Sequence, residues 1–135
     1  MNAALGLSQF NLINRIISKR TMVANKYSSE LSTLKHLRLP SPPRLFTNVY
    51  QKYPLRVIGI DRNELQKHLT RCNISTKSYF GQPVHTTQYY KSLGYEEDLP
   101  VTDEVASEVL NIPIYPDLEV EETQYVIDCI KEFFK

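Results

Sequence analysis

The sequence predicts a mixed fold, with a long helix followed by a small sheet that carries helices on one face. Three observations predict it. Apolar residues recur at three- and four-residue steps over residues 2–34 and over residues 119–134, which is the spacing of one helix face. Between these segments, residues 49–58 contain an alternation of apolar side chains that is typical of a half-buried strand. At 135 residues, the chain has the length of one domain.

The first helix is predicted over residues 2–34. Its apolar positions are Leu5, Leu12, Ile13, Ile16, Ile17, Val23, Ala24, Tyr27, Leu31 and Leu34. Gly6 costs a helix about 1 kcal/mol relative to Ala. We therefore expect a close backbone approach at Gly6, either inside the fold or across an interface. No strand, turn or polar tail precedes this helix, and we expect a further domain upstream of it.

A Pro-rich connector at residues 40–48 cannot continue the helix. The strand at residues 49–58 follows, with Tyr53, Leu55 and Val57 on one face. Pro54 has no N–H to donate to a neighbouring strand. We therefore expect this strand to lie at a sheet edge or to contain a bulge near its middle.

A second helix is predicted to begin after Asp61, which is a good N-cap residue. Glu64 follows three residues later, as a capping box requires. Leu65 and Leu69 form the apolar stripe of this helix. Asn73 tolerates the left-handed conformation that ends many helices, so the helix should end there.

The rest of the chain alternates short elements with loops. We expect a strand at residues 74–80, a loop at 81–85, a short helix that begins at Thr86 or Thr87 and ends at Gly94, a helix from Pro100 to Leu110 with Val101, Val105 and Val109 on one side, an extended segment at 111–116 and a last helix at 119–134. The stripe of the last helix consists of Thr123, Val126, Ile127, Ile130, Phe133 and Phe134.

Composition narrows the function classes. The 16 Lys and Arg residues nearly balance the 15 Asp and Glu residues, so we expect no general attraction to nucleic acid or to anionic membranes. Cys72 and Cys129 are too few for a disulfide scaffold and lack metal-ligand spacing, and each is expected to act as a small hydrophobe. No apolar run approaches the roughly 20 residues of a membrane span, and no signal peptide is recognisable. These features predict a reduced, cytoplasmic protein.

Three side chains are candidates for ligand binding. His85 lies in a loop bounded by Gly and Pro, where functional residues concentrate. Lys77 and Tyr79 precede that loop and alternate to one face of the predicted strand. Together they would suit a phosphate or sugar hydroxyls, and the alternative from spacing alone is an ordinary solvated strand end. His36 and His68 are expected to be surface residues without such a role.

No self-contained active site is recognisable. The four Gly residues are scattered and form no phosphate-binding loop. No Ser or Cys lies in a nucleophile elbow, and no His pair has the helical spacing of a metal site.

Five short motifs, in order, resemble those of the DegT-type sugar aminotransferases. These are pyridoxal-phosphate-dependent enzymes of fold type I that aminate keto-sugars carried on nucleotides. The motifs are AALGLSQF at residues 3–10, YPLRV at 53–57, DRNEL at 61–65 with NIST at 73–76, PVH at 83–85 with YKSLGY at 90–95, and LNIPIYP at 110–116. The resemblance covers essentially the whole chain. Asn73 replaces the usual Gly of the family.

The resemblance implies an α+β C-terminal small domain with a mainly antiparallel sheet. Residues 1–35 would be a long helix that links to a large domain and takes part in interfaces, and residues 36–135 would form the small domain. It further implies that His85, Tyr79 and Lys77 face the substrate. The family's Schiff-base lysine and most contacts to pyridoxal phosphate belong to the large N-terminal domain. We therefore expect no catalytic and no cofactor-binding residue within these 135 residues, and no amino transfer or cofactor binding by this chain alone.

The resemblance also implies partners: a nucleotide-sugar substrate in the complete enzyme, and a homodimer or a separate N-terminal half. An alternative from a different class is a non-catalytic interaction or oligomerisation module, or one subunit of a split enzyme. It would use the apolar stripe of the first helix, because uncovered apolar patches drive association. A nucleic-acid-binding domain finds little support in the balanced charge.

Overall fold

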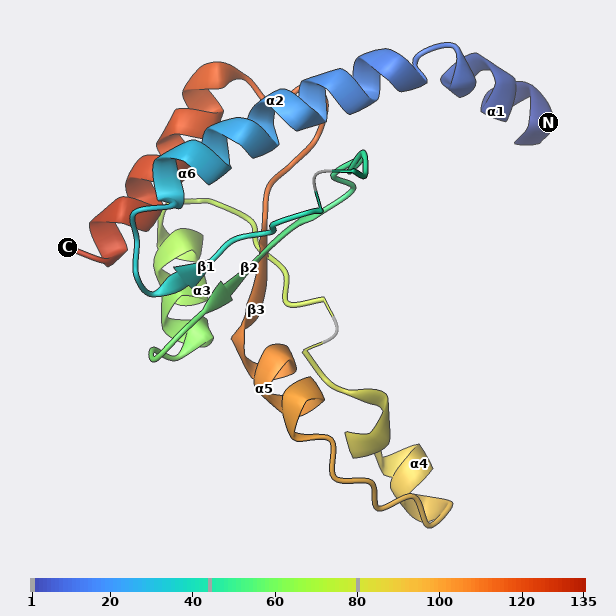
Figure 1. Ribbon diagram of the computed structural model, residues 1–135, viewed down its shortest axis with the longest axis vertical. Coiled ribbons are helices and arrows are strands. Elements are labelled where there is room, and N and C mark those ends of the chain that lie inside the picture. Colours follow the sequence, from blue (N-terminus) through green and yellow to red (C-terminus); the bar gives the residue numbers. More distant parts are fainter. Residues whose placement is uncertain (1, 44, 80) are drawn as a thin grey trace.

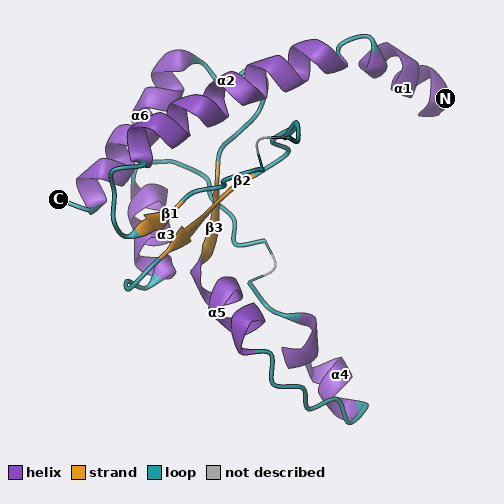
Figure 2. Cartoon of the chain, viewed as in Figure 1, coloured by secondary structure: helices purple, strands orange, loops and turns teal. Residues whose placement is uncertain are grey.

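The structure is a computed structural model that describes residues 2–43, 45–79 and 81–135. Three strands form one sheet, and helices surround it (Figures 1 and 2). The elements in chain order are α1 (Asn2–Phe10), α2 (Ile13–Leu31), β1 (Leu37–Arg38), β2 (Tyr53–Val57), α3 (Arg62–Arg71), the 3-10 helix η1 (Val84–Thr86), α4 (Gln88–Ser92), α5 (Pro100–Glu108), β3 (Val109–Ile112) and α6 (Val120–Phe133). The predicted α+β class with a small antiparallel sheet is confirmed.

The core lies on one face of the sheet. Strand β2 turns Tyr53, Leu55 and Val57 inward, and all three are fully buried. They pack in one cluster with buried residues of α2, α3 and α6, among them Tyr27, Leu31, Leu65, Leu69, Ile127 and Ile130. Fully burying one such aliphatic or aromatic side chain contributes about 1.5–3 kcal/mol, so this cluster is the main stabilising contact of the fold.

The prediction that Pro54 marks a sheet edge or a bulge was wrong, because β2 is the central strand of the order β1-β2-β3. The N–H of Ile58 points toward the β1 side and donates to the carbonyl of His36 at 2.8 Å. Alternation turns the ring nitrogen of Pro54 the same way. β1 pairs only with Arg56 and Val57, so within the described part of the chain no strand faces Pro54 on that side. The proline therefore occupies a locally open edge of a central strand.

The long N-terminal helix predicted over residues 2–34 is two helices, with a turn at Asn11 and Leu12 between α1 and α2. α1 extends away from the rest of the molecule (Figure 1). Its apolar side chains are exposed, so packing, which supplies most helical stability in proteins, does not hold the two segments in one helix. A Cβ added to Gly6 would meet nothing within 4 Å, so the close approach expected inside the fold is wrong.

The end signals of α3 behave as the sequence predicts. The carboxylate of Asp61 accepts a hydrogen bond from the backbone N–H of Asn63 at 2.9 Å, which makes Asp61 the N-cap. The backbone of Asn73 has φ = 58°, the left-handed conformation expected after the helix. A capping box with both of its hydrogen bonds is present at the start of α6 instead, where Glu119 and Glu122 each accept a hydrogen bond from the backbone N–H of the other.

Two boundaries were predicted wrongly around β3. The strand predicted at residues 74–80 is reduced, among its described residues, to a single antiparallel bridge between Lys77 and Asn111. Continuing that register would pair Ser75 with Pro113. Because Pro113 has no N–H to donate, the strand pairing does not continue past the bridge. The helix predicted to reach Leu110 ends at Glu108, because Leu110 pairs with Leu55 in the sheet. The tertiary pairing overrides the helical pattern there.

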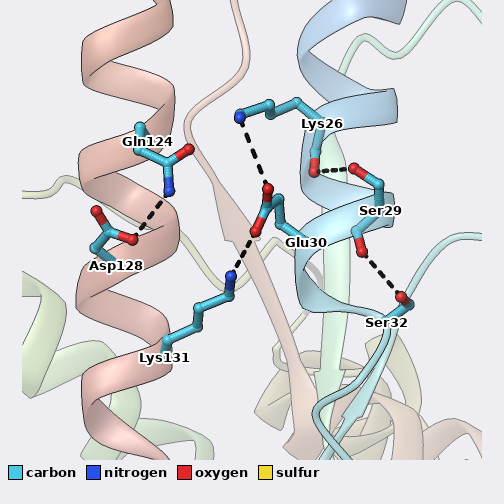
Figure 3. A network of polar contacts seen from close by, with 7 residues as sticks. All are labelled: Lys26, Ser29, Glu30, Ser32, Gln124, Asp128 and Lys131. Carbon is cyan, nitrogen blue, oxygen red and sulfur yellow. Dashed lines mark hydrogen bonds and ion pairs between the residues drawn. The ribbon is translucent and has the colours of Figure 1, made fainter.

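The long helices α2 and α6 lie side by side on the core and are also joined by charges (Figure 3). Glu30 of α2 accepts a hydrogen bond from Nζ of Lys131 on α6 at 2.5 Å, and Nζ of Lys26 lies 3.7 Å from its other oxygen. The hydrogen bond from Lys131 and its positive charge hold the pKa of the Glu30 carboxyl below its usual range. Since these side chains are about one-third exposed, solvent screens the pair.

We expect Glu30→Gln to weaken the acid dependence of stability. A carboxyl whose pKa is lower in the folded state than in the unfolded state adds stability above its unfolded pKa, and loses it as the pH falls through the folded value. The free energy of unfolding of the wild type should therefore drop as the pH falls below about 4.5, and that of the variant should drop less. Urea unfolding at a series of pH values measures both slopes.

Asp128→Asn is the matched control, because Asp128 contacts Gln124 on its own helix and is exposed. Its pH slope should match that of the wild type. Equal slopes for wild type and Glu30→Gln would contradict the role given to the pair of Glu30 and Lys131.

Candidate functional site

A surface pocket of about 250 Å³ lies beside β3. It is lined by the two residues before β2, by the segment at residues 75–79, and by the end of β3 with the residues that follow it. Two of the three side chains singled out from the sequence, Lys77 and Tyr79, are among its lining residues, together with Lys52. The bridge between Lys77 and Asn111 fixes the segment: the two residues exchange backbone hydrogen bonds of 2.8 and 3.1 Å.

Two ammonium groups surround the ring of Tyr79. Nζ of Lys52 lies 3.6 Å from the ring centroid and Nζ of Lys77 lies 5.7 Å from it. Both distances allow a cation–π interaction, in which the face of the ring attracts the positive charge. The cluster therefore combines an aromatic ring with two positive charges at the mouth of a pocket. Such a surface suits a ligand that carries an anionic group beside a ring or hydroxyls.

Two of the lining residues, Asn111 and Thr76, carry buried polar groups. The side-chain amide of Asn111, which is buried, donates to the carbonyl of Lys77 at 3.1 Å. The hydroxyl oxygen of Thr76 is buried and has no hydrogen-bond partner. A buried hydroxyl without a partner costs the fold free energy.

His85 does not line this pocket. It lies in η1, on the extension that α4 and α5 form away from the core (Figure 1). Its Nε2 is 3.2 Å from a carboxylate oxygen of Asp103 in the first turn of α5, and its side chain is 13% exposed. The three predicted site residues are thus divided, with Lys77 and Tyr79 in the pocket and His85 paired with Asp103.

Sequence reasoning missed Lys52 and Asp103. Lys52 precedes β2 and is distant in sequence from Tyr79, so its approach depends on the pairing of β2 with β3 and of Asn111 with Lys77. Asp103 lies 18 residues after His85. No local spacing signals either contact, and only the tertiary fold brings these residues together.

The extension that carries His85 is tied to the sheet by charge. Arg56 of β2 donates to Glu108 from Nε at 2.7 Å and to Glu104 from Nη2 at 2.9 Å, and both carboxylates belong to α5. The hydrogen bond that Arg56 donates to Glu108 is the main cause of a raised pKa of Arg56, which keeps the guanidinium charged. α5 is therefore held in register with β2, and the position of Asp103 follows from that register.

The residues present do not by themselves fit pyridoxal phosphate, the cofactor that the family resemblance implies. That cofactor needs a lysine in a desolvated position to bind its aldehyde group. Every lysine is exposed or partly exposed, including the two beside Tyr79. The pocket is open to solvent and offers no enclosed cavity for the ring.

Among the described residues, no group of three or more His, Cys, Asp or Glu side chains has an arrangement that would hold a metal ion. Within the same residues, no helix is long and apolar enough to cross a membrane.

The comparison with known families covers nearly the whole chain. Residues 1–131 match the model of the DegT/DnrJ/EryC1/StrS aminotransferase family. The chain belongs to this aminotransferase family. The family predicted from the five motifs is thus confirmed.

Individual relatives share the same region. The chain is 32% identical over 115 residues to the erythromycin biosynthesis sensory transduction protein EryC1 of Saccharopolyspora erythraea. The aligned region covers 84% of this chain and 31% of that protein. It is 29% identical over 132 residues to GDP-perosamine synthase of Escherichia coli O157:H7, covering 98% of this chain and 35% of that enzyme. The chain spans about a third of the length of these relatives.

The fold is shared as well. The crystal structure of DesV from S. venezuelae matches with a TM-score of 0.91 at 28% identity, over 98% of this chain and 36% of that chain. Similarity therefore extends over all the elements described above, from α1 to α6.

Proposed function

We propose that this chain is the C-terminal part of a pyridoxal-phosphate-dependent nucleotide-sugar aminotransferase, which transfers an amino group to a keto-sugar. Membership of the aminotransferase family over residues 1–131 carries the proposal. GDP-perosamine synthase, a relative over nearly the whole chain, points to a sugar carried on a nucleotide as the substrate class. Residues 1–35 link to the cofactor-binding domain, and residues 36–135 are the small domain that borders the substrate.

Within this function, Lys77 and Tyr79 contact the substrate together with Lys52. Two ammonium groups within 6 Å of one ring centroid suit the diphosphate of a nucleotide-sugar. The polar residues Ser75 and Thr76, which line the same pocket, suit a sugar hydroxyl. His85 makes a second contact from the extension, where Asp103 orients its imidazole.

The cofactor-binding lysine is supplied by a protein segment other than these 135 residues. Support comes from the exposure of every lysine in the chain and from the open pocket. When bound in the complete enzyme, the cofactor supplies the electron sink for amino transfer. The residues of this chain bind and orient the sugar. Among them, the imidazole of His85 is held in place by its contact with Asp103.

We expect Lys77→Ala and His85→Ala to lower kcat/KM for the nucleotide-sugar by about tenfold each, the effect of losing one charged or hydrogen-bonded contact. The measurement uses the complete enzyme, reconstituted from this chain and the lysine-bearing domain. His36→Ala is the matched control, because His36 bonds the carbonyl of Ile58 and stacks on Phe134, and none of these residues lines the pocket. Unchanged kcat/KM in both variants would reject the assigned contacts.

We expect the 135-residue chain on its own to bind no pyridoxal phosphate at a single lysine. Mixing the two, dialysing and then reducing with borohydride should leave no cofactor-modified lysine peptide at stoichiometric yield. Mass spectrometry of the digested protein makes the measurement. One lysine modified in full would show that the chain carries its own cofactor site.

A second candidate function is an interaction module, and α1 favours it. Leu5, Leu7 and Phe10 are 62%, 70% and 71% exposed, although buried positions are the ordinary place for such side chains. The face around Gly6 is also open, which leaves room for a second helix to approach closely. In this function α1 joins the chain to a second copy or to a separate N-terminal half.

For this candidate, we expect the isolated chain to elute as a dimer or larger species in size exclusion with light scattering. Leu7→Glu combined with Phe10→Glu should convert it to a monomer, because two charges on the apolar face oppose its burial. Val101→Glu is the matched control, since Val101 is equally exposed but lies on α5. A wild-type chain that elutes strictly as a monomer would exclude self-association.

A further inference from the structure

Helix α1 carries an apolar stripe that the described part of the chain leaves uncovered. The stripe follows steps of three and four residues along one side of the helix, and it consists of Ala3, Gly6, Leu7 and Phe10. Residues 3–10 are all exposed, and α1 extends away from the rest of the molecule (Figure 1). The helix contains no Lys, Arg, Asp or Glu, so it can enter an apolar contact without burying a charged side chain.

An apolar groove of about 300 Å³ lies between α2 and the start of α6. Its α2 side is a stripe with the same spacing as the stripe of α1, consisting of Lys19, Met22, Val23 and Lys26. Its other side is formed by residues 116–120 and by Thr123. The side chains of Met22 and Val120 are 67% and 65% exposed. Exposed apolar side chains along a groove mark a surface that binds another apolar element.

The two stripes match each other when two copies of the chain place their α1 and α2 helices antiparallel. If Leu7 of one copy lies opposite Met22 of the second copy, Gly6 lies opposite Val23, Phe10 opposite Lys19, and Ala3 opposite Lys26. Every member of one stripe then meets a member of the other. A two-fold axis between the copies repeats each of these contacts.

The side chains that meet in this register complement each other in size. Gly6 has no side chain, and a Cβ there would meet nothing within its own copy, so the backbone can approach Val23 closely. Leu7 packs on Met22, whose flexible side chain adapts to its neighbours. Phe10 lies over Lys19, where the aliphatic stem packs on the ring and the ammonium group is attracted to its face.

The charges of the two copies are also compatible. Lys19 lies beside the last turn of α1 of the second copy, where α1 has no basic residue of its own. The free carbonyls of that turn carry the negative end of the helix dipole, which attracts the ammonium group. At the other end of the groove, Lys26 keeps Glu30 as its partner at 3.7 Å. No basic side chain of α2 lies opposite another basic side chain in this register.

We propose that two copies of this chain exchange their α1 helices, each of which lies in the groove between α2 and α6 of the other copy. The proposal rests on the interaction function given above for α1, and it adds the surface to which α1 binds. The arrangement uses the same surfaces on both copies, so it closes at two copies. It removes the stripe of α1 and the rim of the groove from water, twice in each dimer.

Met22→Glu combined with Val120→Glu tests the groove. We expect the Kd of the dimer to rise by roughly a hundredfold, because the two-fold axis makes each copy bury the new charges. Sedimentation equilibrium of the 135-residue protein measures the Kd. Both side chains are exposed within one copy, so the circular dichroism spectrum and the Tm of the monomer should match those of the wild type. Val101→Glu is the matched control on α5 and should leave the Kd unchanged.

Opposite charges at the paired positions test the register. Leu7→Lys alone and Met22→Glu alone should each raise the Kd, and the double variant should return it to within about tenfold of the wild type, since the new charges then attract each other. Leu7→Lys combined with Val101→Glu should stay as weak as Leu7→Lys alone. A double variant without any recovery would show that Leu7 and Met22 do not meet.

The possible outcomes separate this inference from the function on which it rests. A dimer that is lost in the variant with Glu at positions 7 and 10, and that is kept in the groove variant, would retain the interaction function and overturn the groove as its site. A wild-type chain that is strictly monomeric would overturn both. Species that grow beyond a dimer as the concentration rises would overturn the two-fold arrangement, because such an arrangement closes.

Discussion

The inward side chains of β2 make the contact on which the rest of the structure depends. Tyr53, Leu55 and Val57 are completely buried, and helices α2, α3 and α6 meet through them rather than through one another alone. The hydroxyl of Tyr53 also hydrogen bonds with Ser28 of α2 at 2.8 Å, and desolvation raises its pKa, so burial keeps the phenol neutral. Removal of this apolar face would leave three helices and two strands without a common surface to cover.

Polar contacts then hold the helices and the segment of Lys77 in place against the strands. Tyr27 of α2 donates its hydroxyl to the carbonyl of Pro113, directly after β3, and burial raises the pKa of its phenol. Arg56 holds α5 against β2, and Asn111 holds the segment of Lys77 against β3. The segment of Lys77 is attached to β3, whereas α5, which carries the partner of His85, is attached to β2, so the candidate contacts lie apart.

Local chemistry made much of the fold predictable. The N-cap at Asp61, the left-handed Asn73 and the buried stripe of α6 depend on neighbours within a turn or two, and a sequence displays such neighbours directly. The break between α1 and α2 and the change from helix to strand at Val109 depend on which surfaces are covered, and on a partner strand far away in sequence. The pairs of Lys52 with Tyr79 and of His85 with Asp103 are of this second kind, so the candidate residues could be singled out along the chain but their partners could not.

The two prolines near the open edge of β2 have a consequence for how the protein behaves in concentrated solution. Continuing the register of Leu37 with Val57 sets Pro40 opposite Pro54, at the place where β1 stops. Neither residue offers an N–H, so a foreign strand that approached this edge would find no donor at that position. Unprotected strand edges are the usual starting points of β-aggregation. The prolines therefore protect a central strand that its short neighbour leaves half uncovered.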